Sequence, residues 1–413
     1  MKSKILALLG GTLLSGVAMA GGYQVNLAGQ RQIGMGHTGT GLALDNASIF
    51  FNPGAMSHLR ENGVTIGGSA IFSKIAYRAL EPGNTEARTD NPAGTPFQVY
   101  GVYGITDKLK AGIGVYTPFG STVKWGNEWS GRFGLEQLKL SAVYIQPTLS
   151  YKITEKLGVG AGLTYVLGSV NLQRSIPVQD QQGNYGHAEL DGDATGVGYN
   201  VGVYFAPTEK ISLGLSYRSQ VDVNVEEGDA TFTVPASLDA RFPDTKFEAT
   251  LPLPATLTLG IGIKPTDKLT LAIDVNRVEW SAYKSLRFDY EEPVSRPAPE
   301  GLVSENARNY EDSYIYRIGA EYKATDALAL RAGAYYDSSP VQDGYLTPET
   351  PDADARGVSV GLGYNLSEKL SLDASFLYIN KKERTDLSDK SGGIGGTYKA
   401  VAYIPGIGLN YKF

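Results

Sequence analysis

Hydrophobic and polar residues alternate along most of the chain from about residue 63 onward. The last segment shows the pattern best: Val401, Tyr403 and Ile407 share one face, and Ala402 and Gly406 lie on the other. Successive side chains of a β-strand point to opposite faces, so a period of two predicts strands with one apolar face. The same period recurs over residues 269–276 and 370–378. The pattern predicts an all-β fold.

Short turns of one composition join neighbouring alternating segments. Each begins with Thr or Ser followed by an acidic residue, and they lie at residues 106–108, 154–156, 208–210, 266–268, 325–327 and 367–369. Longer connections rich in Pro, Gly and acidic residues separate these hairpins, at residues 79–96, 118–136, 223–247, 291–310 and 338–354. A soluble β-sandwich also alternates, with its apolar face inward. Regular exchange of short turns and long loops is instead typical of a transmembrane β-barrel.

The turns also predict the number of strands. Six hairpins contain twelve strands, and further strands at 64–78 and 398–412 raise the number to fourteen. An even number is typical of bacterial barrels, and closure removes sheet edges that hydrocarbon cannot satisfy. The aromatic Phe413 ends the last strand, which is a common feature of outer-membrane assembly. We therefore predict a transmembrane antiparallel β-barrel of about 14 strands over residues 63–413.

The first twenty residues have the pattern of a secretory signal peptide. Lys2 and Lys4 form a positive start, an apolar run follows, and residues 18–20 read Ala-Met-Ala, a small-residue cleavage site. The alternative is a short transmembrane anchor, but the run is short for a bilayer span and no stop-transfer charges follow it. The mature protein is thus predicted to begin at Gly21 in the bacterial outer membrane.

Composition excludes two classes of protein. No other apolar run approaches the ~18 residues that a transmembrane helix needs, although Gly (51) and Tyr (26) are abundant. Removal of the signal peptide leaves 35 basic against 43 acidic residues, a formal charge of −8. Nucleic acid is therefore not expected as a partner, because phosphate binding needs clustered Lys and Arg. Cysteine is absent, which is compatible with passage through the periplasm.

Residues 21–62 do not alternate, and they are rich in glycine. A fourteen-stranded barrel is too wide for side chains alone to fill, so its lumen is either water-filled or plugged. The alternative for this segment is a disordered periplasmic tail. Residues 49–59, which include Ile49, Phe50, Phe51 and Met56, are too apolar for a solvated tail. We predict an N-terminal plug at 21–62.

Two motifs in this segment resemble the hatch of the FadL/TodX family of outer-membrane transporters. They are Arg31-Gln32-Ile33-Gly34-Met35-Gly36 and the run from Asp45 to Gly54, in which Phe50, Phe51, Asn52, Pro53 and Gly54 are the predicted plug residues. Gly54 stands where the family usually has Ala, but Pro53 still predicts a turn. Shorter similarities follow in order at 118–120, 129–133, 146–151, 254–257, 279–283, 316–319, 330–333 and 337–341.

The resemblance implies a function and a route. It implies passive, plug-gated uptake of long-chain fatty acids or other hydrophobic molecules, and it leaves aromatic hydrocarbons open as cargo. It also implies that cargo leaves sideways through a kink in the third strand, for which Gly112, Gly114 and Pro118 are the candidates here. Glycine and proline suit an interrupted ladder, although glycines recur in many strands of this chain.

Cargo of this kind needs an apolar path and a partner for any charged head group. Burial of sixteen carbons contributes roughly 12 kcal/mol at most, at ~0.8 kcal/mol per methylene. Candidate binding residues in the third outer loop are Phe119, Trp125, Trp129, Arg132 and Phe133. The aromatic residues predict a landing surface, with loop packing or a membrane-interface girdle as the alternative. Arg132 is a candidate for the cargo carboxylate, with a loop salt bridge as the alternative.

Alternation also places three arginines in the lumen. If Tyr316 and Ile318 face lipid, Arg317 faces inward, and the same reasoning applies to Arg331 and Arg218. These residues are candidates for the cargo carboxylate or for anchors of the plug. The alternative is structural pairing with lumenal acids, for which Glu321, Asp274 and Asp373 are the candidates.

Three other functions are alternatives to the transport of hydrophobic cargo. A general aqueous porin would have a charged constriction and no plug, and a surface adhesin would use only the long acidic loops. A barrel hydrolase would need a nucleophile beside His37, His58 or His187, and no such motif is present. No paired His or Cys spacing predicts a metal, and neither an enzyme activity nor a cofactor is expected. The expected partners are hydrophobic small molecules, outer-membrane lipid and lipopolysaccharide, around a monomer.

Overall fold

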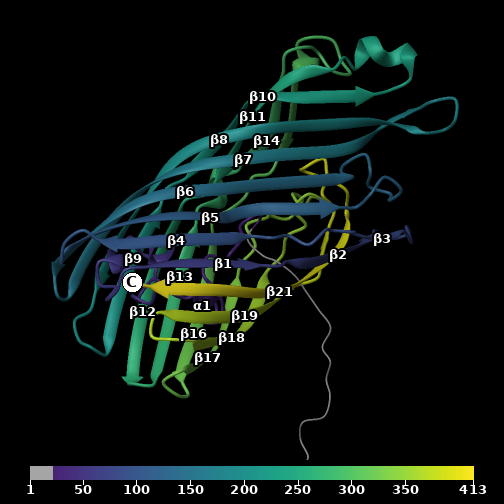
Figure 1. Cartoon of the computed structure of the whole chain (residues 1–413). Helices are drawn as coiled ribbons and strands as arrows, with labels where there is room; N and C mark the ends of the chain where they lie inside the picture. The colour runs from purple at the N-terminus through teal and green to yellow at the C-terminus, as the bar shows by residue number, and fades with distance from the viewer. Residues whose placement is uncertain (1–21) are drawn as a thin grey trace, which may run out of the picture.

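The chain forms a closed antiparallel β-barrel of fourteen strands, as predicted (Figure 1). The computed structural model describes residues 22–413, so the predicted signal peptide lies outside the described residues. The first and last strands close the wall, since β1 (Gly63–Ser69) pairs with β21 (Gly396–Lys412) from Gly63↔Lys412 to Ser69↔Gly406. Closure leaves no free edge along the membrane-crossing part of these two strands.

Several of the fourteen wall strands are interrupted, so the wall contains 21 strand segments. In chain order the wall strands are β1 with β2 (Phe72–Ala79); β3 (Glu86–Arg88) with β4 (Phe97–Gly104); β5 (Leu109–Lys124); β6 (Gln137–Thr154); β7 (Leu157–Gln179); β8 (Tyr185–Phe205); β9 (Ile211–Arg218) with β10 (Val221–Thr233); β11 (Thr245–Leu253) with β12 (Thr256–Thr266); β13 (Leu269–Val278) with β14 (Ser285–Tyr290); β15 (Val303–Ala307) with β16 (Ser313–Lys323); β17 (Leu328–Asp337); β18 (Ala355–Asn365); β19 (Leu370–Lys381); and β20 (Arg384–Asp386) with β21. Short 3-10 helices lie in the outer connections, at η1 (Ala236–Arg241), η2 (Trp280–Ala282) and η3 (Glu300–Leu302).

All six predicted short turns are present, and their shared composition has a structural reason. In the first turn the Thr106 hydroxyl accepts hydrogen bonds from the backbone N–H groups of Lys108 and Leu109. The first residues of the other five turns accept in the same way. A Ser or Thr hydroxyl thus replaces a backbone acceptor in each tight reversal.

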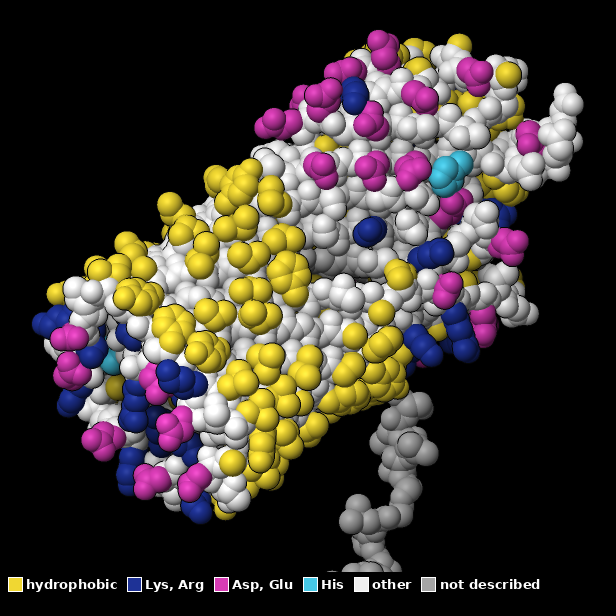
Figure 2. Space-filling model, in the orientation of Figure 1, with side chains coloured by type: hydrophobic (Ala, Val, Ile, Leu, Met, Phe, Trp, Pro, Cys, Tyr) yellow, Lys and Arg dark blue, Asp and Glu magenta, His cyan; other side chains and the backbone are white. Residues whose placement is uncertain are grey.

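The two faces of the wall differ as alternation predicts. On β16, Tyr316 and Ile318 are 52% and 56% exposed, whereas the intervening Arg317 is 3% exposed. On the face that Figure 2 shows, hydrophobic side chains form a broad band across the barrel, with charged residues gathered at both ends. This band is the surface that hydrocarbon covers in a membrane. Among residues 22–413, no helix is both long and apolar enough to cross a bilayer.

Several strands extend far beyond the membrane on the side of the long loops, which corrects two predicted loop boundaries. Residues 118–124 belong to β5 and residues 223–233 to β10, whereas the composition of both segments predicts loops. The strands β7 and β8 have 23 and 21 residues, whereas ~9–11 residues cross a bilayer. The extra length forms the acidic upper part of the molecule in Figure 2.

Residues 22–62 lie inside the barrel, mostly buried, and close the end that carries the short turns. This segment, here called the plug, contains three single-turn helices, α1 (Gln30–Ile33), α2 (Ser48–Phe51) and α3 (Pro53–Met56). Its glycines permit direct backbone contact with the wall. A Cβ atom on Gly333 of β17 would lie 2.0 Å from the nitrogen of Gly36, which itself has φ +68°. Glycine at both positions therefore permits the backbone of the plug to pack directly against the wall.

Polar contacts attach the plug to many wall strands. The carboxylate of Asp274 accepts hydrogen bonds from the backbone nitrogens of Gly39 (2.9 Å) and Thr40 (3.0 Å). Arg31 forms a bidentate ion pair with Glu321 at 2.6 and 2.8 Å. Glu321 also pairs with Arg331 at 2.7 Å. Glu321, Arg331 and Asp274 are buried, whereas the Arg31 side chain is 24% exposed, so the loss of one partner is costly for the buried groups.

Candidate functional site

An apolar pocket lies in the upper half of the barrel, above the plug. The empty space around its lining is about 910 Å³, which includes open solvent at its mouth. The strands β6, β7, β8, β10, β11 and β14 supply most of its wall, and its apolar lining includes Leu138, Leu140, Ala142, Val170, Leu172, Ala194, Val223, Val225, Leu251, Leu253, Leu286 and Phe288. These residues are the inward members of alternating strands that continue beyond the membrane.

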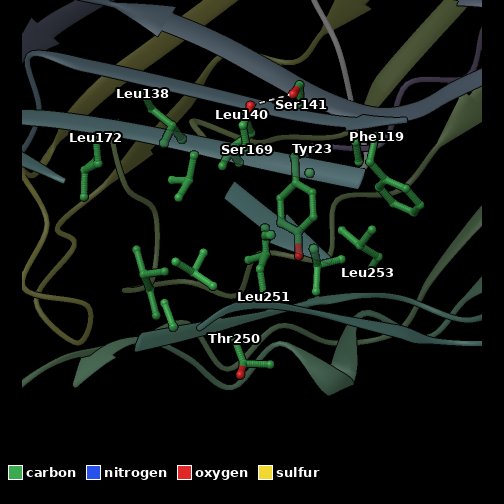
Figure 3. Close-up of a pocket in the computed structure, with 18 of the residues that line it drawn as sticks. Tyr23, Phe119, Leu138, Leu140, Ser141, Ser169, Leu172, Thr250, Leu251 and Leu253 are labelled. Carbon is green, nitrogen blue, oxygen red and sulfur yellow. Dashed lines mark hydrogen bonds between the residues drawn. The ribbon is translucent and has the colours of Figure 1, made fainter. Parts of the chain in front are cut away.

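Tyr23, near the start of the plug, stands inside this pocket (Figure 3). Its hydroxyl donates a hydrogen bond to the backbone oxygen of Pro252 at 2.6 Å. Its ring packs edge-on against Trp280, with ring centres 4.9 Å apart. The preceding Gly22 has φ +61°, and a Cβ atom there would lie 2.7 Å from the Trp280 ring. Residues 22–28, here called the N-terminal arm, are thus fitted to the pocket floor.

The N-terminal arm pairs with an irregularity in β5. The ladder between β5 and β6 shifts register between Tyr116 and Phe119, as expected for a β-bulge. Beside this shift, Val25 donates a hydrogen bond to the Pro118 oxygen (2.7 Å), and Gly120 donates to the Tyr23 oxygen (3.0 Å). Among the predicted kink residues, Pro118 lies at the irregularity. Gly112 and Gly114 instead lie in regular pairs with both β4 and β6.

The wall between the second and third wall strands is incomplete at this level. The last β4–β5 pair is Gln98↔Tyr116, and the next backbone link above it joins Asp90 to the Lys124 oxygen at 2.8 Å. Among the described residues, no backbone hydrogen bond connects 92–96 with 118–123. This gap, here called the window, is covered from inside by the N-terminal arm.

The pocket has one charged end, formed by Arg308 and Glu349 from two outer connections. Their side chains lie 3.4 Å apart and are 3% and 15% exposed. Neither residue was predicted from the sequence, and neither was Tyr23. The sequence gives little signal for them, because Arg308 is one of two arginines, with Arg296, in the connection 291–310.

The predicted landing cluster is divided by the structure. Phe119 lines the pocket. Trp125 and Trp129 stack on each other at 4.5 Å and are only 6% exposed, so they form the core of the third outer loop rather than an open surface. Arg132 and Phe133 are half-buried, and the Arg132 guanidinium lies 4.7 Å from the ring of the exposed Tyr185. Within residues 22–413, Arg132 forms no salt bridge, and its guanidinium donates instead to the backbone oxygens of Glu128 and Trp129.

The three predicted lumenal arginines face inward and hold internal partners. Arg331 pairs with Glu321 and Asp373, so the predicted structural alternative is confirmed for this residue. Arg317 donates to the Gly36 oxygen at 3.3 Å.

Arg218 holds the aromatic part of the plug. It donates to the Phe50 oxygen at 3.1 Å and lies 4.6 Å from the Phe50 ring centre. Phe51 packs beside it on the ring of His37. Asn52 has an extended backbone and caps Pro53–Met56 through Gly54, as expected before proline. A carboxylate role for these arginines remains a prediction, because each is engaged by the protein.

None of the three histidines matches a nucleophile–base arrangement. Near His187, the Glu136 carboxylate lies between the ring (3.2 Å) and the Ser175 hydroxyl, whereas a catalytic triad places the histidine in the middle. His58 contacts Ser57 at 3.1 Å, but its Nε2 has no hydrogen-bond partner among residues 22–413. Within the same residues, no group of three or more His, Cys, Asp or Glu side chains is arranged to hold a metal ion.

Residues 11–413 match the sequence model of the outer membrane protein transport protein family (OMPP1/FadL/TodX). The chain belongs to this family. Among similar proteins, the 47 kDa outer membrane protein of Pasteurella multocida is 28% identical over 97% of this chain and 96% of its own length. The long-chain fatty acid transport protein of Salmonella typhi is 22% identical over 97% and 96%.

Solved structures of the FadL/TodX family share the fold. A Pseudomonas aeruginosa FadL homologue superposes with a TM-score of 0.82, at 20% identity, over 95% of this chain and 100% of that one. The P. putida toluene transporter TodX gives 0.73, at 19% identity, over 93% and 98%. The protein is therefore an outer-membrane β-barrel of a family that transports hydrophobic compounds.

His37 provides a pH-sensitive link between the arm and the rest of the plug. Its Nε2 accepts a hydrogen bond from Ala28 at 3.0 Å, which only the neutral ring can do. Burial, with a smaller contribution from Arg317, lowers the pKa of His37 well below its ordinary value. Its contribution to stability is therefore present above the unfolded pKa of about 6.5 and is lost as the pH falls below it.

We expect the arm to loosen as the pH falls from 7.5 to 5. A spin label on Gln24→Cys would report this as a growing mobile fraction, without background because the chain has no other cysteine. In His37→Gln, the side chain keeps an acceptor but does not titrate, so the pH response should disappear. An equal response in both proteins would contradict the assignment to His37.

Proposed function

We propose that the protein carries long-chain fatty acids and similar long, single-chain hydrophobic molecules across the outer membrane by passive diffusion, with a sideways exit through the window. One observation supports this most directly: the apolar pocket lies next to the window, and the N-terminal arm covers the window on the pocket side. Tyr23, Phe119 and Gly120 border the pocket and the window together.

The shape and lining of the pocket favour a long apolar tail. Its wall is almost entirely aliphatic or aromatic, and it draws on six neighbouring strands. Each buried methylene contributes ~0.8 kcal/mol, so a long tail gains more in this pocket than a single ring does. The gain is limited by the entropy that the bound chain loses, which permits release.

The floor of the barrel favours a sideways route over a vertical one. The plug backbone contacts wall glycines directly, and Arg31, Asp274 and Glu321 attach it to the wall. A vertical path would require several buried charges to separate, at ~3–5 kcal/mol for each pair. The arm is attached more weakly. Hydrogen bonds between neutral groups hold it, among them those donated by Tyr23, Val25 and Gly120, each contributing ~0.5–1.5 kcal/mol.

Two alternative functions remain, the uptake of aromatic hydrocarbons and a general aqueous porin. An aromatic hydrocarbon would fill the space beside Tyr23, where Phe119, Trp280 and Tyr283 surround the ring. This is the second candidate, and the toluene transporter TodX shares the fold. A general aqueous porin has less support, because the plug occupies the lumen. The pairing of β1 with β21 closes the barrel, which supports a monomer in contact with outer-membrane lipid and lipopolysaccharide.

The test is saturable binding of radiolabelled hexadecanoic acid to the purified mature barrel, compared with two variants. Ala194 is buried and lines the pocket, so Ala194→Phe should fill it and weaken binding at least tenfold. Ala320 lies on the lipid face of β16, and Ala320→Phe is the matched control that should bind as the parent does. Toluene binding without hexadecanoic acid binding would favour the aromatic cargo. Equal binding by all three proteins would place the cargo elsewhere.

A further inference from the structure

The neutral polar groups that line the pocket already have hydrogen-bond partners. An incoming head group would have to displace these partners to use them. The pairs are Ser141 with Ser169 (2.7 Å), Thr250 with Asn224 (2.8 Å), Tyr23 with the Pro252 oxygen (2.6 Å), and Thr350 with Tyr310 (2.7 Å). Along most of its length the pocket therefore offers a head group few free hydrogen-bonding partners. Its charged end is the exception.

At that end, Arg308 is already neutralised. Its Nη2 lies 3.4 Å from Glu349 Oε1, its Nη1 donates to the Ala307 oxygen, and the guanidinium lies beside Tyr283. The second carboxylate oxygen, Glu349 Oε2, is buried and has no hydrogen-bond partner within residues 22–413. A buried acceptor without a partner is costly, and a ligand that donates a hydrogen bond removes this cost.

We propose that the Arg308–Glu349 pair selects cargo with an uncharged head group that donates a hydrogen bond. This inference rests on the proposed function and narrows its substrate class to long-chain alcohols and fatty acids in their protonated form. A hydroxyl hydrogen binds Glu349 Oε2, and the oxygen of the same head group accepts from the Arg308 guanidinium. An ionised carboxylate offers no donor and brings a second negative charge beside Glu349, where little water is present to screen it.

The charges around the Arg308–Glu349 pair also favour an uncharged head group over an anionic one. Both side chains are at least 85% enclosed, so their mutual attraction is only weakly screened by salt. Tyr283, Tyr310 and Tyr398 interact electrostatically with the pair, and none of the three carries a charge at neutral pH. Lys381 is paired with Asp352, so it provides no additional counter-charge for an anionic cargo.

The test measures displacement of a fluorescent sixteen-carbon probe from the full mature barrel by three unlabelled ligands. Hexadecan-1-ol donates and accepts, 1-methoxyhexadecane only accepts, and hexadecane-1-sulfonate is a permanent anion. For the parent protein we expect hexadecan-1-ol to bind at least tenfold more tightly than either of the others. Partition of each ligand into detergent is the same for every variant, so comparisons between variants do not depend on it.

Two variants and a control assign the preference to the pair. Glu349→Gln removes the negative charge and leaves Arg308 unpaired, so the sulfonate should gain at least tenfold relative to the alcohol. The double variant Arg308→Met with Glu349→Leu has no charge, and the alcohol should lose its advantage over the ether. Glu311→Gln makes the same charge change on an exposed residue of the connection that carries Arg308, and it should behave as the parent does.

The outcomes separate this inference from the proposed function. Tighter binding of the sulfonate than of the alcohol by the parent protein would overturn the inference while leaving long-chain cargo intact. An unchanged order of ligands in Glu349→Gln and in the double variant would also overturn it. If none of the three sixteen-carbon ligands displaces the probe, the proposed function itself fails.

Discussion

Replacing Glu321 with Gln is expected to release the plug from the wall and to open the barrel intermittently. The Glu321 carboxylate is 3% exposed and joins Arg31 of the plug to Arg331 of β17. The substitution removes the carboxylate that both guanidinium groups share, which leaves Arg331 paired with Asp373 and takes away the ion-pair partner of Arg31, whose side chain is 24% exposed. Removal of one partner from a buried pair costs ~3–5 kcal/mol, and ~1.4 kcal/mol changes an equilibrium tenfold. We therefore expect the population with an undocked plug to rise at least a hundredfold.

Two measurements check this result. In planar bilayers, the parent should show a low and steady conductance, whereas Glu321→Gln should show frequent openings. In a Met35→Cys background, maleimide should react faster when Glu321 is replaced, because Met35 belongs to the plug and is fully buried while the plug is docked. Glu368→Gln, on an exposed short turn, is the matched control. Equal conductance and equal labelling in all three proteins would contradict the assignment of this ion pair to plug docking.

The barrel wall could be predicted from the sequence because its rules are local. Side chains alternate with a period of two, and each short turn begins with a Ser or Thr whose hydroxyl caps the reversal. The inward position of Arg317 and the outward position of Tyr316 follow from this period alone. The short-turn hydroxyls were visible as a repeated composition before their hydrogen bonds were known.

The outer ends of the strands could not be located in the same way. Alternation continues past the membrane in β5 and β10, and Pro118 near the middle of β5 resembles a strand end. The pairing partners that extend these strands, such as β6 for β5, lie beyond the range of any local pattern. Composition of the segment therefore predicted a loop where long-range pairing forms a strand.

The site was predicted only in part for a related reason. Aromatic residues in the third outer loop suggested a surface, but Trp125 and Trp129 stack on each other and pack edge-on against Tyr77 within the loop core. The groups that define the pocket come from the two ends of the chain. Tyr23 and Glu349 lie more than three hundred residues apart, and no spacing rule connects them. Their meeting depends on closure of the whole barrel.

The second large effect is expected when the N-terminal arm is fixed over the window by a disulfide. Gln24 and Phe119 face each other as an antiparallel pair, with the backbone hydrogen bonds on either side of them. Cα atoms in such a pair are ~4.5 Å apart, within the ~4.4–6.8 Å that a disulfide spans. The chain has no other cysteine, so Gln24→Cys with Phe119→Cys forms a single defined bridge. The bridge should close the route from pocket to membrane.

The most direct test of sideways exit is uptake of labelled hexadecanoic acid by cells that carry this double-cysteine protein, before and after reduction. The oxidised form should transport at no more than a tenth of the rate of the reduced form, and reductant should restore uptake. A second bridge between Val99→Cys and Val115→Cys joins β4 to β5 below the window and controls for cross-linking itself. Equal uptake by the oxidised and reduced forms of the arm-bridged protein would show that cargo does not pass behind the N-terminal arm, and the sideways route would be wrong.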